Sequence, residues 1–484
     1  MIRAAAVTSL AGRCLGLLSA SMLVPLVLAI RGERDDPRPM LYASLITAAA
    51  AVVLATVSRS RSREEELRHR EALFLVVLIW TLAGLFGSLP FLFSPQFMTF
   101  TDALFESVSG FTTTGASILS EVESLTPSVQ LWRHLTHWLG GIGVVMLMIA
   151  VLPVVGFGTA QLYRAQVGRT SDKLKPRFVE TARALWKIYV GLTLAEYIAL
   201  RLAGMGPFDA VCHAFSTIAT GGFSTRNTSV ASFSNPAIEY IIVLFMVLAS
   251  MNFARHYRLW TERKPLEFLC DLEIRWHVII LSAATLVVFA GLVGQAGYGL
   301  EVAFRRALFQ VTSIGTCTGF ATDDYEKWRP VAQLLLLALM YTGGNTGSTA
   351  GGLKTFRIIL MTRVIRQHLS RVIHKRGVFA LRVGSEVLPD ETGRNALSMV
   401  ALVLIFNFAL SLLMTATGAD ILTSISSVAS AMFGVGPGLG TVGPAENYAH
   451  LPTLAKWLLV ISMIAGRIEF YTALVIFTPM FWRK

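Results

Sequence analysis

The sequence predicts an all-α integral membrane protein: two N-terminal spans, followed by four repeats that each contain a span, a short re-entrant helix with a loop, and a second span. Three observations lead to this fold class. The 484 residues are 54% hydrophobic and only 15% charged, whereas soluble proteins carry about 25% charged residues. The apolar residues fall in long runs, and a bilayer core needs about 20 mostly apolar residues per helix. A short polar motif also recurs about every 100 residues.

The two N-terminal spans are expected near residues 15–30 and 42–58, in the runs GLLSASMLVPLVLAI and ASLITAAAAVVLATV. No small-residue cleavage site followed by a soluble domain comes after the first run, so we expect a retained span rather than a signal peptide. Counting all apolar runs, the chain is expected to cross the membrane about ten times.

The basic residues are distributed unevenly between the two sides of the membrane. When loops are assigned alternately, starting with the N-terminus inside, the inside segments hold 30 of the 42 Lys and Arg residues. This bias follows the positive-inside rule and predicts that both termini are cytoplasmic. It also explains most of the net charge of +12, so no nucleic-acid partner is expected. The inside segments are 1–14, 59–71, 153–187, 254–275, 354–394 and 482–484.

Four related motifs define the repeats. ALFESVSGFTTTG (103–115) and ALFQVTSIGTCTG (307–319) agree at seven of thirteen positions, AVCHAFSTIATGG (210–222) has the same character, and ILTSISSVASAMFGVGPG (421–438) is more divergent. Each begins as a helix of about ten residues, too short to cross a bilayer, and ends in a glycine turn. The terminal glycines are Gly115, Gly221, Gly319 and Gly436, at separations of 106, 98 and 117 residues.

Such loops point to cation passage. Irregular backbone at membrane depth is tolerated only where it is buried in protein or lines a water-filled cavity. Four loops that converge on one axis would surround it with carbonyl oxygens, which can replace the hydration shell of a monovalent cation. Glycine at the turn permits backbone angles that a Cβ would penalise. The loops fall on the side poor in Lys and Arg, so this path is expected to open to the outside.

Catalytic and metal-binding patterns are scarce. The four cysteines, Cys14, Cys212, Cys270 and Cys317, have no metal-ligand spacing. His134 and His137 stand three residues apart, with no carboxylate at the spacing of a zinc helix. We expect them to be interfacial polar residues at a helix start. The chain is therefore predicted not to be an enzyme and to have no covalently bound cofactor.

In its motifs the chain resembles the Trk/Ktr/HKT superfamily of potassium transporters, and within it the TrkH/TrkG branch, which carries two extra N-terminal spans. The resemblance covers nearly the whole chain. The motifs that carry it are TTTGAS (112–117), ATGGFST (219–225), TCTGFATDD (316–324), VGPGLG (435–440), HWLGGIGVVML (137–147), GGNTGSTAGGLK (343–354) and GRIEFYTALVIF (466–477).

The resemblance implies four span, pore-loop, span repeats around one pore in the bacterial inner membrane, with K⁺ as the transported ion. It also implies a homodimer on a cytoplasmic, TrkA-like ring, with nucleotide bound only by that partner. Gly115, where sodium-passing relatives carry Ser, favours potassium. Proton- or sodium-coupled symport and a simple channel both stay open. The implied potassium filter comprises Thr113, Thr114, Gly115, Ala219, Thr220, Gly221, Cys317, Thr318, Gly319, Gly434, Val435 and Gly436.

The stretch TGGNTGSTAGGLKTF (342–356) is expected to interrupt a membrane helix. Its spacing departs from that of a phosphate loop, and it follows an apolar span rather than a core strand. Each glycine costs a helix about 1 kcal/mol relative to alanine. The resemblance implies a gate below the filter, with Arg467 as a second gate element because an arginine inside an apolar span is costly. The alternative is that these glycines only allow close packing. The gate residues are Gly343, Gly344, Gly347, Ser348, Thr349, Gly351, Gly352 and Arg467.

Five segments are predicted: the N-terminal pair of spans, 1–72, and four pore repeats, 73–165, 166–265, 266–390 and 391–484. The basic inner stretch 364–383 reflects either the positive-inside bias alone or a docking surface for a regulatory subunit or anionic membrane lipid. Two alternative functions remain: a KdpA-like potassium-binding subunit of an ATP-driven pump, and a polytopic membrane enzyme.

Overall fold

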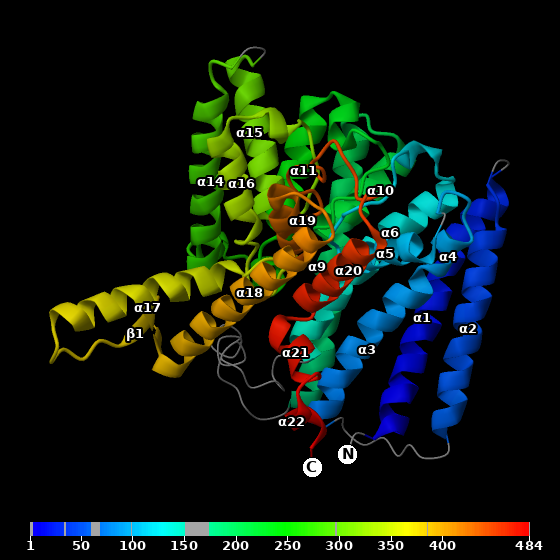
Figure 1. Ribbon diagram of the computed structural model, residues 1–484, viewed down its shortest axis with the longest axis horizontal. Coiled ribbons are helices and arrows are strands. Elements are labelled where there is room, and N and C mark those ends of the chain that lie inside the picture. The colour runs from blue at the N-terminus through cyan, green and yellow to red at the C-terminus, as the bar shows by residue number, and fades with distance from the viewer. Residues whose placement is uncertain are drawn as a thin grey trace.

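The computed structural model describes residues 3–32, 35–59, 68–97, 99–150, 174–295, 298–384 and 386–483. The described chain is helical apart from one antiparallel hairpin of two short strands, so the predicted all-α class is confirmed. Much of the basic inside segments 59–71 and 153–187, and the boundary at 165/166, lie outside the described residues. Figure 1 shows both chain ends at the same end of the molecule.

The two N-terminal helices form a hairpin against the first repeat. Helix α1 packs along the length of α2 and contacts α3 and α6. Asp35, in the connection between α1 and α2, accepts hydrogen bonds from the backbone amide and the hydroxyl of Ser128 at 2.7 and 2.8 Å. These bonds satisfy groups at the start of α6, whose amides have no partner within the helix. The hairpin comprises α1 (Ala4–Arg31) and α2 (Arg38–Arg59).

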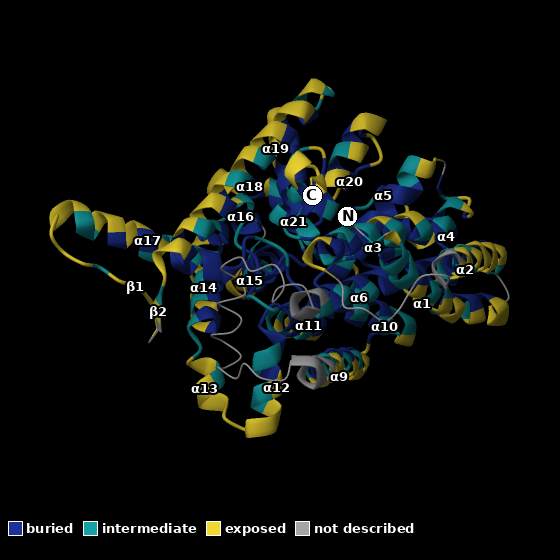
Figure 2. Ribbon diagram, turned by 90° about the horizontal axis from the view of Figure 1, so that it is seen from below, coloured by how far each residue is buried: buried dark blue, intermediate teal, exposed yellow. Residues whose placement is uncertain are grey.

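Each repeat places a re-entrant helix between two further helices. The re-entrant helices have 12, 12, 16 and 13 residues. Their C-terminal halves are buried apart from the half-buried Phe215 and Leu308 (Figure 2). Proline at the first turn, where its missing amide costs nothing, begins α10, α11 and α16. The helices of the first two repeats are α3 (His69–Gly87), α4 (Leu89–Leu92), α5 (Phe100–Phe111), η1 (Val122–Ser124), α6 (Pro127–Ala150), α9 (Leu174–Leu202), α10 (Pro207–Ile218), η2 (Ser229–Phe233), α11 (Pro236–Ala249) and α12 (Phe253–Glu262). Those of the last two are α13 (Pro265–Leu269), α14 (Leu272–Leu292), α15 (Leu300–Gly315), η3 (Tyr325–Lys327), α16 (Pro330–Met340), α17 (Thr355–Ile373), α18 (Asp390–Ala416), α19 (Ile421–Phe433), α20 (Thr453–Arg467), α21 (Phe470–Val475) and α22 (Pro479–Trp482).

The second helix of a repeat is broken more often than expected. Five described helices are long and apolar enough to cross a membrane unbroken. The predicted break lies between α16 and α17, but α11 and α12 also meet at an angle of 96°, and α20 ends at Arg467 before α21. Neither extra break contains a glycine cluster, so glycine content alone did not reveal them.

The predicted repeat boundaries fall inside helices. Position 72/73 lies within α3, 265/266 within α13 and 390/391 within α18. Helices α3 and α18 start a little earlier than the apolar runs that predicted them, because the polar residues of their first turns belong to the helix. Helix α17 and the strands β1 (Leu381–Val383) and β2 (Glu386–Leu388) project sideways from the body of the molecule (Figure 1).

Candidate functional site

The four re-entrant helices end in the same way. At each end one residue has a left-handed backbone, and the amide after it donates to the carbonyl of a serine five residues earlier, which is a Schellman ending. The hydrogen bonds measure 2.8, 2.8, 2.8 and 2.9 Å and join Thr114 to Ser109, Gly221 to Ser216, Thr318 to Ser313 and Val435 to Ser430. The left-handed residues are Thr113, Thr220, Cys317 and Gly434, with φ of 52, 54, 55 and 68°.

Four glycines then bring the loops into contact. A Cβ added at Gly115 would overlap the carbonyl oxygen of Gly221, one at Gly222 that of Thr318, and one at Gly319 that of Val435. A Cβ at Gly436 would lie 2.8 Å from the carbonyl oxygen of Thr114. These contacts run once around all four repeats and close a ring, called the loop ring below. It comprises residues 113–115, 220–222, 317–319 and 434–436.

In the second loop, the residues that belong to the ring are 220–222, one position later than the predicted 219–221. Ala219 has a right-handed backbone and caps α10, as Thr112 caps α5. Gly222, with φ of 77°, takes the place of Gly115, Gly319 and Gly436. Two adjacent glycines are ambiguous in the sequence. A serine six residues before each ring glycine, which all four motifs contain, would have identified Gly222.

Two carbonyl groups in each loop of the ring are available to a ligand, whereas the carbonyl of Gly436 accepts from the hydroxyls of Ser430 and Tyr448. No described residue donates a hydrogen bond to the two carbonyls that precede the ring glycine in any of the four loops. The C-terminal ends of the four re-entrant helices also lie here, and the helix dipole makes such ends favourable for cations. The arrangement can therefore replace water around a cation without a charged side chain.

Two cavities lie on either side of the loop ring. One, with a volume of about 150 Å³, is lined by all four ring glycines and by the loops that lead to the following spans; we call it the vestibule. The other, with a volume of about 40 Å³, is lined by Thr112, Thr114 and Gly434 from the loops and by Gly351 and Arg467. We call it the inner cavity. The ring is thus a constriction between two hollows.

The glycine-rich loop lies against the inner side of the loop ring. The amide of Gly352 donates to the carbonyl of Phe433 at 3.2 Å, and the hydroxyl of Thr349 donates to the carbonyl of Ile218 at 3.1 Å. Both acceptors are the last residues of re-entrant helices. A Cβ at Gly351 would overlap the oxygen of Phe433 and lie 3.6 Å from the Cβ of Cys317. The loop therefore occupies the space directly below the ring.

The same loop is folded tightly on itself. Gly343, Gly347 and Gly352 have φ of 70, 79 and 77°, and a Cβ at Gly344 would lie 2.7 Å from the carbonyl oxygen of Ser250. The hydroxyl of Ser348 donates to the carbonyl of Asn345 at 2.6 Å. These glycines are required for the local backbone and not only for close helix packing.

Arg467 connects the glycine-rich loop to the last repeat. Its Nη1 atom donates to the carbonyl of Thr349 at 2.9 Å, while its Nε and Nη2 atoms have no hydrogen-bond partner among the described residues. The nearby carboxylate of Glu469 binds Arg357 at 3.0 Å instead. Lys354 was not among the predicted gate residues, although it is buried, has φ of 72° and donates to the carbonyl of Ala350.

Comparison with known proteins now decides the family. Residues 41–484 match the family described as TrkH, cation transport protein. This chain belongs to the TrkH family. The Trk system potassium uptake protein TrkH of Salmonella typhimurium is 39% identical over 99% of both chains, and the Trk system potassium uptake protein TrkG of Escherichia coli (strain K12) is 33% identical over 99% of this chain and 98% of its own.

A solved structure agrees with this assignment. The crystal structure of the potassium transporter TrkH from Vibrio parahaemolyticus matches with a TM-score of 0.92 at 36% identity, over 100% of both chains. The predicted family is confirmed. These relatives are named as transport proteins, neither as enzymes nor as subunits of ATP-driven pumps.

In this TrkH-family chain, polar side chains of the re-entrant helices hold the loops from behind. The amide three residues after the ring glycine is the donor in three of the repeats. Ile118 donates to Glu106 at 3.1 Å, Thr322 to Gln310 at 3.0 Å, and Leu439 to Ser426 at 2.9 Å. The alignment of ALFE with ALFQ contained this signal, because Glu106 and Gln310 occupy the same motif position.

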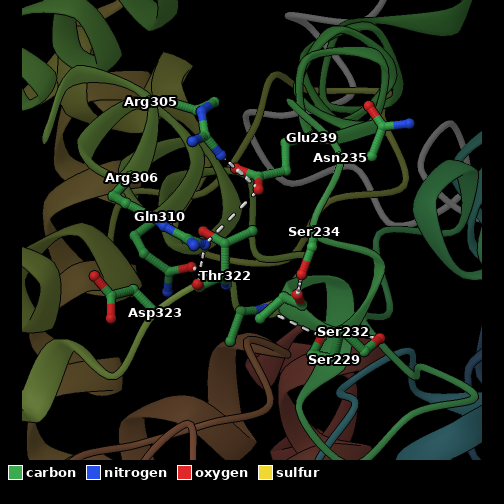
Figure 3. Close-up of polar contacts among 12 residues, drawn as sticks. Ser229, Ser232, Ser234, Asn235, Glu239, Arg305, Arg306, Gln310, Thr322 and Asp323 are labelled. Atoms are coloured by element: carbon green, nitrogen blue, oxygen red, sulfur yellow. Dashed lines mark hydrogen bonds and ion pairs between the residues drawn. The ribbon is translucent and has the colours of Figure 1, made fainter. Parts of the chain in front are cut away.

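A second set of contacts joins the second and third repeats (Figure 3). Arg305 donates to Glu239 at 2.7 Å, and Arg306 donates to the carbonyl of Thr322. The amide of Ala321 donates to the hydroxyl of Ser229 at 3.1 Å. This network holds the third loop at Ala321 and Thr322, two and three residues after the ring glycine Gly319.

The prediction that His134 and His137 are interfacial is wrong. Both are fully buried against the second re-entrant helix. Their Nδ1 atoms lie 2.8 and 3.2 Å from the hydroxyl of Ser216. A Cβ at Gly221 would overlap the ring of His137. Helix α6 is covered by the neighbouring repeat, which no local sequence pattern could show.

Two acids meet at the rim of the vestibule. Glu326 accepts a hydrogen bond from the amide of Gly440, and a Cβ at Gly443 would meet both its carboxylate and that of Glu446. Burial and the neighbouring Glu446 raise the pKa of Glu326 to about 7. The charge of Asp324 also raises the pKa of Glu326. Asp324 itself forms an ion pair with Lys327 at 3.0 Å.

This acid pair predicts a pH-dependent stability. The pKa of Glu326 is higher in the folded protein than its ordinary value of 4.5. Its contribution to the free energy of unfolding is therefore complete below about pH 4.5 and is lost as the pH rises through about 7. We expect the thermal midpoint of the purified protein to fall between pH 5 and 8, and the fall to be smaller in Glu326→Gln. Glu121→Gln, at an exposed acid in the first outer loop, is the control; an equal change in both variants would contradict the assignment.

Proposed function

We propose that this chain takes up potassium across the bacterial inner membrane. The four-loop ring acts as the selectivity filter, and K⁺ exchanges its water for ring carbonyls as it passes from the vestibule to the inner cavity. The membrane potential drives entry with about 2.3 kcal/mol per charge per 100 mV. The observation that carries this proposal is the closed ring of loops in which the two carbonyls before each ring glycine accept no hydrogen bond from a described residue. The names of the relatives, which are potassium uptake proteins, support it.

The glycine-rich loop and Arg467 form the gate. The loop binds the ends of two re-entrant helices and fills the space that an ion leaving the ring would enter. The guanidinium of Arg467 places a positive charge at the wall of the inner cavity, which opposes a cation. Its bond to Thr349 holds the loop closed, so the two elements move together.

The proposed assembly is a homodimer controlled by a cytoplasmic, TrkA-like ring of nucleotide-binding subunits. Both termini face the cytoplasm, on the side where basic residues collect. Helix α17 projects from the body (Figure 1) and carries Arg363, Arg366 and Arg371. It supplies a basic surface for the regulatory ring or for anionic lipid. No nucleotide site is proposed in this chain.

Uptake of radioactive rubidium into proteoliposomes holding the purified protein tests the function. We expect uptake that unlabelled potassium blocks and an equal concentration of sodium does not. Equal competition by sodium would contradict a selective filter. Because a closed gate would also prevent uptake, the measurement is made in parallel on Arg467→Ala, and absence of uptake in both proteins would refute the proposal.

A further inference from the structure

A buried ion pair lies directly behind the first and second loops of the ring. The Nε atom of Arg133 donates to Glu106 Oε1 at 2.6 Å. The exposed fractions of these residues are 2% and 0%. Arg133 stands on α6 and Glu106 on the first re-entrant helix, so the pair is formed within the first repeat. Such a pair is costly to bury unless further hydrogen bonds satisfy both groups.

Those further bonds lead to two different loops. Glu106 accepts from the hydroxyl of Ser117 at 2.9 Å and from the amide of Ile118 at 3.1 Å, both in the first loop. Arg133 donates to the carbonyl of Ser224 at 3.0 Å and lies 3.5 Å above the ring of Phe223, both in the second loop. The ion pair is therefore one continuous connection between loops of neighbouring repeats.

The position of this connection matters for the width of the ring. It joins residues that immediately follow Gly115 and Gly222, and a Cβ at Gly115 would already overlap the carbonyl oxygen of Gly221. The second loop cannot move away from the first without breaking a charge-assisted hydrogen bond. Arg133 also lines the vestibule, where an uncompensated cation would repel K⁺.

In the described parts of the other repeats, no ion pair joins two loops of the ring in this way. Nine residues before the ring glycine, where the first repeat has Glu106, the others have His213, Gln310 and Ser427. Within the described residues, His213 binds the hydroxyl of Ser224 at 3.0 Å and Gln310 the amide of Thr322. Neither forms an ion pair across two loops. The first and second loops are thus joined by an ion pair, whereas His213 and Gln310 each bind a residue of their own repeat.

We infer that Arg133 and Glu106 are positioning residues that set the spacing of the first two loops and thereby the preference of the ring for potassium over sodium. This inference rests on the proposed function. The pair touches no ion itself. It acts through the carbonyl groups that precede Gly115 and Gly222, which must stay far enough apart to fit the larger ion.

The test removes the connection without changing net charge. In the double variant Glu106→Gln/Arg133→Gln, the glutamine at position 106 still accepts from the amide of Ile118, as Gln310 does from Thr322 in the third repeat. The shorter glutamine at position 133 no longer reaches the carbonyl of Ser224. We expect the potassium/sodium permeability ratio in proteoliposomes to fall about tenfold, the equivalent of one charge-assisted hydrogen bond. The matched control is Glu239→Gln/Arg305→Gln, which removes another buried ion pair of similar length, 2.7 Å, that makes no hydrogen bond to a residue of the loop ring (Figure 3).

The possible outcomes distinguish failure of this inference from failure of the proposed filter on which it rests. An unchanged ratio in the double variant, with a lowered ratio in Gly115→Ser, overturns the inference and leaves the filter standing. An unchanged ratio in both overturns the filter itself. An equal fall in the Glu239/Arg305 control shows general destabilisation and also overturns the inference. If the double variant does not fold, Arg133→Lys keeps the charge but loses the planar fork, and the same fall is expected from it; a wild-type ratio there overturns the inference.

Discussion

Replacing Gly351 with alanine is expected to increase cation flux strongly, because the new Cβ would overlap the carbonyl oxygen of Phe433. The glycine-rich loop would have to move away from the end of α19 and lose the 3.2 Å bond from Gly352 to Phe433. Overpacking of this kind costs about 2 kcal/mol, which shifts the ratio of closed to open protein about 30-fold. Rubidium uptake without the regulatory partner measures the change.

The control for this variant is Gly291→Ala in α14, where an added Cβ meets nothing within 4 Å. It should leave the uptake rate at the wild-type value. Arg467→Ala removes the bond to Thr349 and the positive charge together, so it should also increase uptake. Arg467→Lys separates the two effects, since it keeps the positive charge but loses the guanidinium that binds the carbonyl of Thr349. Wild-type rates in both Gly351→Ala and Arg467→Ala would refute the gate.

Replacing Gly115 with serine is expected to reduce the potassium/sodium permeability ratio at least about tenfold, which corresponds to a lost preference of about 1.4 kcal/mol. The serine Cβ would overlap the carbonyl oxygen of Gly221, and the φ of 81° at this position disfavours any side chain. The second loop must shift, so its carbonyls no longer match those of the other three. Reversal potentials or competitive uptake with the two cations measure the ratio.

A contrasting variant sharpens this prediction. Gly434 also has a positive φ, but a Cβ there would lie 3.7 Å from the nearest atom, the carbonyl oxygen of Thr113, which is an ordinary contact. Asparagine tolerates the left-handed backbone better than other residues with a side chain. Gly434→Asn should therefore change the ratio much less than Gly115→Ser. Equal losses in the two variants would mean that overlap with the neighbouring loop is not the cause.

Much of the candidate site can be predicted from the amino-acid sequence. The repeated motifs locate the four loops, and three of the four sets of filter residues coincide with the loop ring. The second set is displaced by one residue, because Gly221 and Gly222 are equivalent in a sequence while only Gly222 has a positive φ. Glycine density and an arginine in an apolar span indicate the proposed gate. The pairing of Arg357 with Glu469 was not predicted, because the two residues belong to different repeats.

The sequence by itself determined the membrane class, the number of repeats and the short re-entrant helices. These features depend on hydrophobicity, helix length and glycine position, which act over a few turns of chain. Only the tertiary structure decided which loop touches which, that Arg133 holds the first two loops together, and that Arg467 binds the glycine-rich loop. These contacts join residues about 100 positions apart, and their geometry is set by how whole repeats pack around one axis, so no local pattern encodes it.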